Sequence, residues 1–197
     1  MSLTSLTALS PVDGRYAARC ADLRGIFSEQ GLIHARIRVE IAWLRALAAE
    51  RQIPELRGLA PADLETAQQV AESFDAADAA AVKAFERETN HDVKAVEYLI
   101  KQKLAAHAGW QARVEFVHFA CTSEDVNNLS YALMCRDARA TVLLPRLDTL
   151  LGALRSMAHA HAEDAMMART HGQAATPTTL GKEVAVFVHR LRQARDT

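Results

Sequence analysis

A chain of 197 residues, half of them apolar, is long enough to bury one large hydrophobic core or two smaller ones. Its 23 Lys and Arg residues nearly balance its 24 Asp and Glu residues, so no overall field draws the protein to nucleic acid or to a membrane surface. The three cysteines form no C-x-x-C pair, which argues against a disulfide framework and against a zinc knuckle. No apolar stretch approaches the ~20 residues that span a bilayer, and the N-terminus lacks a signal-peptide pattern. We therefore expect a soluble, cytoplasmic protein without a metal site.

Helical periodicity dominates the first half of the chain, and convincing strand alternation is absent. Apolar residues at intervals of three and four predict a first helix over residues 28–52. A proline suited to a first helical turn opens a second helix over 61–74, and an aspartate can cap a third over 75–87. A fourth is expected over 92–107.

The second half of the chain predicts longer helices. A short helix is expected around 113–119, followed by a long one from residue 122 that Pro145 kinks or divides. Such lengths suit a bundle of long helices. We therefore expect an N-terminal helical domain over 1–111 and the first part of a central bundle domain over 112–197.

Residues 167–177 show no period and are rich in Thr, Gly and Gln, so we interpret them as a loop. Thr176 and Pro177 resemble the N-cap and first position of a last helix. That helix continues to Thr197 without a stop signal. A long apolar stripe with too few partner helices indicates an all-α bundle that lacks members, and we expect the chain to be truncated.

Four polar segments occur where a plain helical bundle does not need them. The first is SPVDGRY at 10–16, where a guanidinium and a phenol follow a glycine that lets the backbone turn. Arg15 and Tyr16 suit a phosphate or carboxylate ligand, because a guanidinium donates in a fixed fork. A surface turn in an N-terminal arm explains the same residues without a ligand.

The second segment is TNHDVK at 89–94. Asn90 and Asp92 are good helix caps, so the start of a helix explains them by itself. His91 lies between them. The dipole at a helix N-terminus disfavours its imidazolium form, which suits a neutral hydrogen-bond donor.

The third segment is CTSEDVNN at 121–128. Thr122 and Ser123 lie where the free N–H groups of the long helix point outward, and their hydroxyls add donors. Together they form a corner suited to a carboxylate or a phosphate. The alternative is an ordinary Ser/Thr cap with a solvated acidic first turn.

The fourth segment is RTHGQAATP at 169–177, which places Thr170, His171 and Gln173 between two helices. A histidine in a loop can serve as an acid or as a base near neutral pH. A single loop histidine is also often incidental.

Taken together and in this order, the four segments resemble the fumarase/aspartase superfamily. TSEDVNN and RTHGQAATP are similar to its first two signature regions, and SPVDGRY with TNHDVKAVEY narrows the resemblance to the adenylosuccinate lyase family. Ala174 departs from the proline of many relatives, which affects loop stiffness more than chemistry. The resemblance implies three helical domains, a homotetramer, and active sites built from segments of three subunits.

The resemblance also implies the reaction, which is β-elimination of fumarate from adenylosuccinate, giving AMP, and from SAICAR, giving AICAR, without a cofactor. The implied general acid is His171. By the same resemblance, the corner at 122–123 holds a succinyl carboxylate and residues 15–16 contact the phosphate. Residues 90–92 line the same pocket, where His91 serves either binding or proton transfer. The full set of implied substrate-binding residues is Arg15, Tyr16, Asn90, His91, Asp92, Thr122, Ser123, Thr170 and Gln173.

The base in this family is a serine in a segment of the form GSSxMPxKxNP, and nothing similar occurs in residues 1–197. We therefore expect this polypeptide alone to have no lyase activity. Two alternatives stay open. One is a superfamily member with another substrate, such as argininosuccinate lyase, aspartase or fumarase. The other is a helical assembly or binding module without catalysis.

Overall fold

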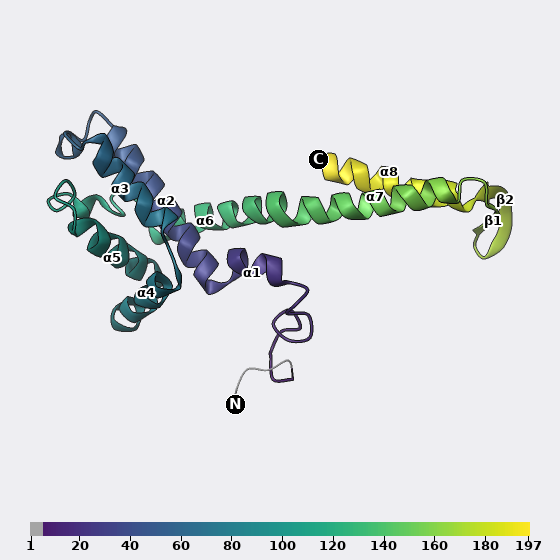
Figure 1. Cartoon of the computed structure of the whole chain (residues 1–197), viewed down its shortest axis with the longest axis horizontal. Coiled ribbons are helices and arrows are strands. Elements are labelled where there is room, and N and C mark those ends of the chain that lie inside the picture. The colour runs from purple at the N-terminus through teal and green to yellow at the C-terminus, as the bar shows by residue number, and fades with distance from the viewer. Residues whose placement is uncertain (1–5) are drawn as a thin grey trace. The chain divides into compact units, whose positions relative to one another are not determined.

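The computed structural model describes residues 6–197, and the chain divides into two compact units, residues 1–137 and 138–197. Each unit is described by itself below. Helices make up most of both, which confirms the expected all-α character apart from one short sheet (Figure 1). The domain boundary expected near residue 111 stays a prediction.

The helices of the first unit follow the predicted pattern closely. In chain order they are α1 (Ala21–Phe27), α2 (Glu29–Ala49), η1 (Pro54–Leu56), α3 (Pro61–Glu72), α4 (Ala76–Thr89), α5 (Asp92–Ala105), η2 (Val114–Phe116) and α6 (Ser123–Ala138). Ser28 caps α2 by accepting the N–H of Gly31, and Asp75 caps α4. Helix α1 is the one that periodicity does not predict, and it buries no residue.

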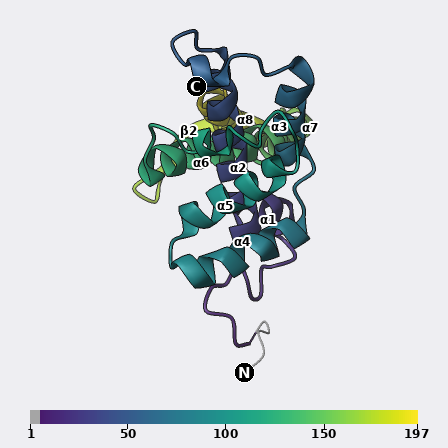
Figure 2. The ribbon, with the colours of Figure 1, turned by 90° about the vertical axis from the view of Figure 1, so that its left-hand side faces the viewer.

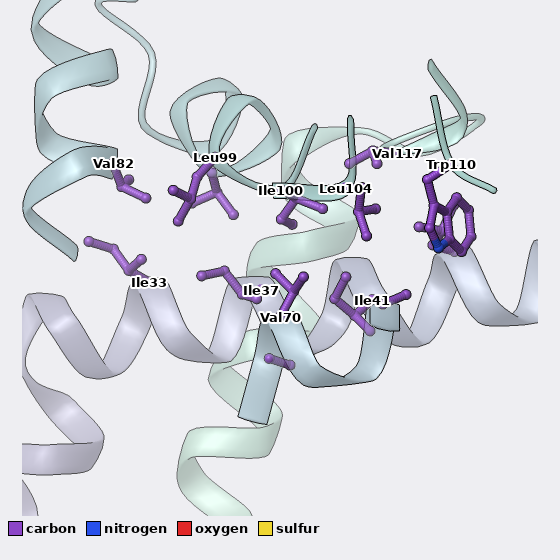
Figure 3. Close-up of a cluster of buried hydrophobic side chains, with 14 of the residues drawn as sticks. Ile33, Ile37, Ile41, Val70, Val82, Leu99, Ile100, Leu104, Trp110 and Val117 are labelled. Carbon is purple, nitrogen blue, oxygen red and sulfur yellow. The ribbon is translucent and has the colours of Figure 1, made fainter. Parts of the chain in front are cut away.

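The core of this unit lies between α2 and α5. In Figure 3, Ile33, Ile37 and Ile41 of α2 point toward apolar side chains of the facing elements. Their fully buried neighbours include Val82, Leu99, Ile100, Leu104 and Trp110. Each such side chain contributes about 1.5–3 kcal/mol relative to its exposed state. Helices α2, α4 and α5 therefore pack side by side (Figures 1 and 2), and this packing positions the loops that connect them.

The second unit is a helical hairpin with a small sheet. Its elements are the π-helical turn η3 (Arg139–Leu143), α7 (Leu144–Ala160), β1 (Ala165–Thr170), β2 (Gln173–Thr179) and α8 (Leu180–Asp196). Helices α7 and α8 lie side by side, with the sheet at the connection between them (Figure 1). Gly181 allows this approach, because a Cβ there would lie 2.3 Å from the carbonyl oxygen of Ala158. Near the other end, Nε and Nη2 of the Arg195 guanidinium donate to the two carboxylate oxygens of Asp148, at 2.6 and 3.1 Å.

The expectation of a loop over 167–177 is wrong, because these residues form most of an antiparallel hairpin. Both faces of its two strands are largely exposed, so the chain carries no alternation of apolar and polar residues that would reveal them. Pro177 is not the first residue of a helix but lies in β2, opposite Met167. A two-stranded sheet consists of edge strands, where proline is tolerated. The cap of α8 is instead Thr179, whose hydroxyl accepts the N–H of Lys182 at 3.1 Å.

Pro145 starts a second helical segment, one of the two outcomes expected of it. It occupies the first turn of α7, directly after the π-helical turn. The apolar stripe expected to face inward along α7 and α8 is only partly covered: most of its residues are half-buried, and Leu150 and Phe187 are 48 and 61 % exposed. Among residues 6–197, no helix is long and apolar enough to cross a membrane.

Candidate functional site

A buried arginine joins two of the four polar segments. Arg36 on α2 is 3 % exposed. Its guanidinium donates to Asp92 Oδ2 at 2.6 Å and, through Nε, to Asn127 Oδ1 at 2.9 Å. The TNHDVK and CTSEDVNN segments therefore lie close together in the first unit, because Nε and Nη2 of one guanidinium each donate to one of them. The sequence hints at this role of Arg36 only by placing an arginine within the apolar stripe of α2. Helical periodicity does not assign that arginine a function.

The carboxylate of Asp92 is held in its ionised form by this arrangement. Burial raises its pKa, but the N–H of Val93 and the guanidinium of Arg36 outweigh burial, so the pKa of Asp92 lies below its ordinary value. The side chain remains 48 % exposed. Asp92 is therefore anchored on one side and open to solvent on the other.

Asn90 and His91 have different local roles from those expected. Asn90 closes α4 as a left-handed C-cap with φ 51°, and His91 caps α5 by accepting the N–H of Lys94 at Nδ1, at 3.2 Å. The asparagine side chain tolerates a left-handed backbone better than most, which explains its place at this junction. Because Nδ1 is an acceptor, the ring proton of His91 lies on Nε2, and this N–H is available as a donor.

The start of α6 already holds a carboxylate of the protein. Both the N–H and the hydroxyl of Thr122 donate to Asp125 Oδ2, each at 2.8 Å, and the N–H of Asp125 contacts the Thr122 oxygen in return. These donors lower the pKa of Asp125. Ser123 follows as the first residue of the helix. The corner thus has the donors expected of an anion site, and the carboxylate of Asp125 accepts two of them.

Arg15 and Tyr16 lie in a series of turns before α1. The guanidinium of Arg15 stacks 4.6 Å from the centre of the Tyr16 ring, and Tyr16 is 41 % exposed. Within residues 6–197, no hydrogen bond or ion pair joins either side chain to the other three segments. The structure does not bring this pair together with Asp92 or Thr122.

The fourth segment forms the tip of the hairpin in the second unit. His171 and Gly172 both have positive φ, 51° and 76°, and Thr170 pairs with Gln173 beneath them. Two central residues of positive φ are the mark of a tight hairpin turn whose twist matches its strands. His171 is exposed at the tip, and Thr170 and Gln173 flank it. The structure thus brings these three predicted residues together, on a tight hairpin turn rather than on an irregular loop.

A hollow of about 760 Å³ lies between α2 and α6, beside the start of α6. Its lining is mostly apolar and includes Trp43 and Leu129, and the CTSEDVNN segment contributes Cys121 and Asp125. Arg38 and Arg136 also line it, but both pair with the carboxylate of Asp137, so the hollow suits a ligand with several negative charges poorly. The polar corner of Thr122 is therefore the better candidate for an anion.

The comparisons with known proteins cover nearly the whole chain. It is 48 % identical over 193 residues to the adenylosuccinate lyases of Vibrio cholerae serotype O1 and Escherichia coli strain K12, and 46 % identical to that of Legionella pneumophila strain Corby. These alignments include 98 % of this chain but 42 % of each relative, so the chain spans less than half the length of the curated relatives it matches.

Two solved structures are similar over 89 % of this chain and 38 % of their own. One is the 3-carboxy-cis,cis-muconate lactonizing enzyme from Pseudomonas putida, with a TM-score of 0.66 and 26 % identity. The other is a fumarate lyase from Mesorhizobium sp. BNC1, with a TM-score of 0.70 and 20 % identity, which shows a shared fold. A family model described as "Lyase" matches residues 14–197. The chain therefore belongs to this lyase family.

Proposed function

We propose that the protein containing this chain is an adenylosuccinate lyase of the cytoplasm. It eliminates fumarate from adenylosuccinate, giving AMP, and from SAICAR, giving AICAR. The observation that carries the proposal is the 48 % identity to adenylosuccinate lyases over 98 % of the chain. The aligned length includes nearly all residues, so a substrate assignment drawn from it does not depend on one short motif.

The reaction needs a base for a carbon-bound proton, an acid for the departing nitrogen, and donors for two carboxylates and a phosphate. His171 is the proposed general acid. The tight turn at the hairpin tip supports this role, because its paired strands fix the backbone on both sides of the proton donor. Thr170 and Gln173 then lie beside it as donors to the succinyl group.

The start of α6 is the proposed site of a succinyl carboxylate. The donors of Thr122 bind Asp125 in this structure, so the substrate carboxylate takes over those donors. Ser123 adds its hydroxyl at the helix start. Arg15 and Tyr16 bind the nucleotide phosphate, and the exposed Nε2–H of His91 and the side chain of Asn90 line the same pocket.

The complete enzyme is a proposed homotetramer with active sites shared between subunits. The exposed apolar side chains of α7 and α8, such as Leu150 and Phe187, support this proposal. Large apolar side chains at helical spacing are ordinarily covered by partner helices. The four polar segments then need not meet within one chain.

The proposed catalytic base is a serine of a GSSxMPxKxNP segment, which residues 1–197 do not contain. We therefore expect the polypeptide 1–197 to release no fumarate from adenylosuccinate. Turnover by this polypeptide that exceeds that of its His171→Ala variant would contradict this expectation.

The substrate assignment is tested with the complete gene product that carries this sequence. Fumarate release from adenylosuccinate is measured for the unmodified protein, for His171→Ala, and for His107→Ala, which removes an exposed histidine outside the four segments. We expect His171→Ala to lose at least about a hundredfold in kcat, and His107→Ala to retain the full rate. No release by the unmodified protein would remove the substrate assignment. Competitive inhibition by AMP, and not by arginine or malate, separates this reaction from those of related lyases.

A further inference from the structure

Three potential metal ligands from distant parts of the sequence meet in the first unit. They are Glu40 on α2, His118 after η2, and Cys121 just before α6. One ligand atom of each lies within 4.8 Å of the other two. His118 Nδ1 contacts Glu40 Oε1 at 2.5 Å and Cys121 Sγ at 3.6 Å. Sequence spacing does not reveal this cluster, because Glu40 lies 78 residues before His118 and the pair His118 and Cys121 is too short a pattern to indicate a site by itself.

The carboxylate of Glu40 is buried and only partly satisfied. Its side chain is fully buried, and its Oε2 has no hydrogen-bond partner. A buried carboxylate oxygen without a partner is costly, which is why such atoms usually bind a proton donor or a cation. An ordinary Glu–His ion pair provides a partner for Oε1 of Glu40 only, whereas a bound cation would provide one for both carboxylate oxygens.

The electrostatics of the cluster favour a positive ligand. Burial, as the largest cause, and the negative charges of Glu40 and Asp125 together raise the pKa of the Cys121 thiol to about 11. The two carboxylates therefore place negative charge near the thiol. A divalent cation reverses that effect, because it stabilises the thiolate as well as the carboxylate.

The spacing of the ligands is close to that of a tetrahedral zinc site. Zinc bonds of about 2.0–2.3 Å place neighbouring ligand atoms roughly 3.3–3.8 Å apart. The separation between His118 and Cys121 already has this value. The separation between His118 and Glu40 needs to widen by about 1 Å, which is within the reach of side-chain rotation.

The segment that carries two of the ligands is held firmly on α2. The indole N–H of Trp43 donates to the carbonyl oxygen of Phe119 at 2.7 Å. His118 and Ala120, on either side of this contact, both have positive φ, 64° and 58°. This unusual backbone directs the ring of His118 toward Glu40. Cys121 also lines the open hollow between α2 and α6, which gives a metal ion a route from solvent.

From this geometry we propose that Glu40, His118 and Cys121 form a binding site for a divalent transition-metal ion of the zinc type. The ligands are the carboxylate of Glu40, Nδ1 of His118 and the thiolate of Cys121. Three protein ligands leave the fourth position to water from the adjoining hollow. A mixed set of oxygen, nitrogen and sulfur favours zinc or cobalt over magnesium or calcium.

Cobalt(II) is the probe, because a cobalt–thiolate bond produces charge-transfer absorption in the near ultraviolet and tetrahedral cobalt absorbs strongly in the visible. The reduced chain 1–197 is titrated with cobalt and then with zinc as a competitor. We expect both absorption features in the unmodified chain and their loss on addition of zinc. Cys121→Ser should remove the charge-transfer feature, and Glu40→Gln should weaken cobalt binding at least about tenfold. Cys135→Ser, which alters an exposed thiol on α6, should change neither.

A second measurement does not depend on a variant that folds. Zinc should slow alkylation of Cys121 and leave that of Cys135 unchanged, as followed by mass spectrometry of peptides from the unmodified chain. Absence of the charge-transfer feature, its persistence in Cys121→Ser, or alkylation rates of Cys121 that zinc does not change would each overturn the proposal. The remaining explanation would then be a buried Glu–His pair with a bystander thiol. Because no step of the test measures catalysis, its result is independent of the proposed lyase function.

Discussion

The guanidinium of Arg36 lies 2.6 Å from the carboxylate of Asp92, and the arginine is buried while the aspartate is about half exposed. The arginine therefore depends on the aspartate for its charge compensation more than the aspartate depends on the arginine. Asn127 supplies a third group but no charge. The ion pair joins α2 to α5, and the hydrogen bond to Asn127 adds α6 at the point where two of the polar segments meet.

Replacement of Asp92 by Asn should destabilise the first unit, because the guanidinium of Arg36 then remains buried without a counter-charge. We expect a loss of about 1–3 kcal/mol in the free energy of unfolding, below the value for a fully buried pair because water screens the exposed side of Asp92. Urea unfolding of the chain 1–197 measures it. Asp13→Asn, an exposed aspartate in the N-terminal turns, is the control and should have little effect. Equal losses in both variants would contradict the role of the ion pair.

The contribution of Asp92 should also depend on pH. Its pKa is lower in the folded chain than in the unfolded chain, so the stabilisation is present above the unfolded value of ~3.9 and is lost as pH falls through the folded value. The stability difference between the unmodified chain and Asp92→Asn should therefore be constant near neutral pH and shrink below about pH 4. Urea unfolding of both proteins over this range tests the sign. A difference that grows in acid would be inconsistent with it.

The hairpin tip should be sensitive to the loss of Gly172. A Cβ at φ 76° costs roughly 1–2 kcal/mol, and this strain falls directly beside His171. Gly172→Ala in the complete gene product should lower kcat for fumarate release. Gly58→Ala introduces similar strain at φ 85°, in a loop of the first unit with free space around it. This control should lower stability by a comparable amount and leave kcat unchanged, so equal kcat losses would contradict a positioned general acid.

The two glycines of the helical hairpin should respond in opposite directions. Gly181→Ala places a methyl group against the backbone of Ala158 and should destabilise the packing of α7 on α8 by about 1–3 kcal/mol. Gly152 on α7 has nothing within 4 Å of the added carbon, so Gly152→Ala should stabilise the helix by about 0.5–1 kcal/mol through backbone entropy. Thermal unfolding followed by circular dichroism measures both. A destabilising Gly152→Ala would mean that this face of α7 is covered in solution.

The helices of the first unit could be predicted from the sequence because their buried faces repeat at helical intervals. Val93, Val96 and Leu104 of α5, all expected to face inward, are fully buried. The hairpin could not be predicted in this way, because strands exposed on both faces carry no apolar alternation. The resemblance to the adenylosuccinate lyase family was carried by motifs, and the comparisons confirm it.

The candidate site was predicted less completely than the fold. Each short segment is visible in the sequence because its residues are neighbours. The contacts of Arg36 with Asp92 and Asn127, and of Glu40 with His118, join residues that are 56 to 91 positions apart. No local pattern encodes such pairs. The roles proposed for His171 and the nine substrate-binding residues remain predictions that the experiments above address.

The carboxylate that Asp125 supplies to the start of α6 has a consequence for selectivity. It acts as a tethered competitor at a high effective concentration, because it is fixed three residues from the Thr122 donors that it occupies. An anion from solution binds to the Thr122 donors only if it binds them more tightly than the carboxylate of Asp125 does. Weakly bound ions such as chloride are therefore excluded at ordinary concentrations. A ligand that is held elsewhere as well can displace Asp125, because its own carboxylate is then also tethered.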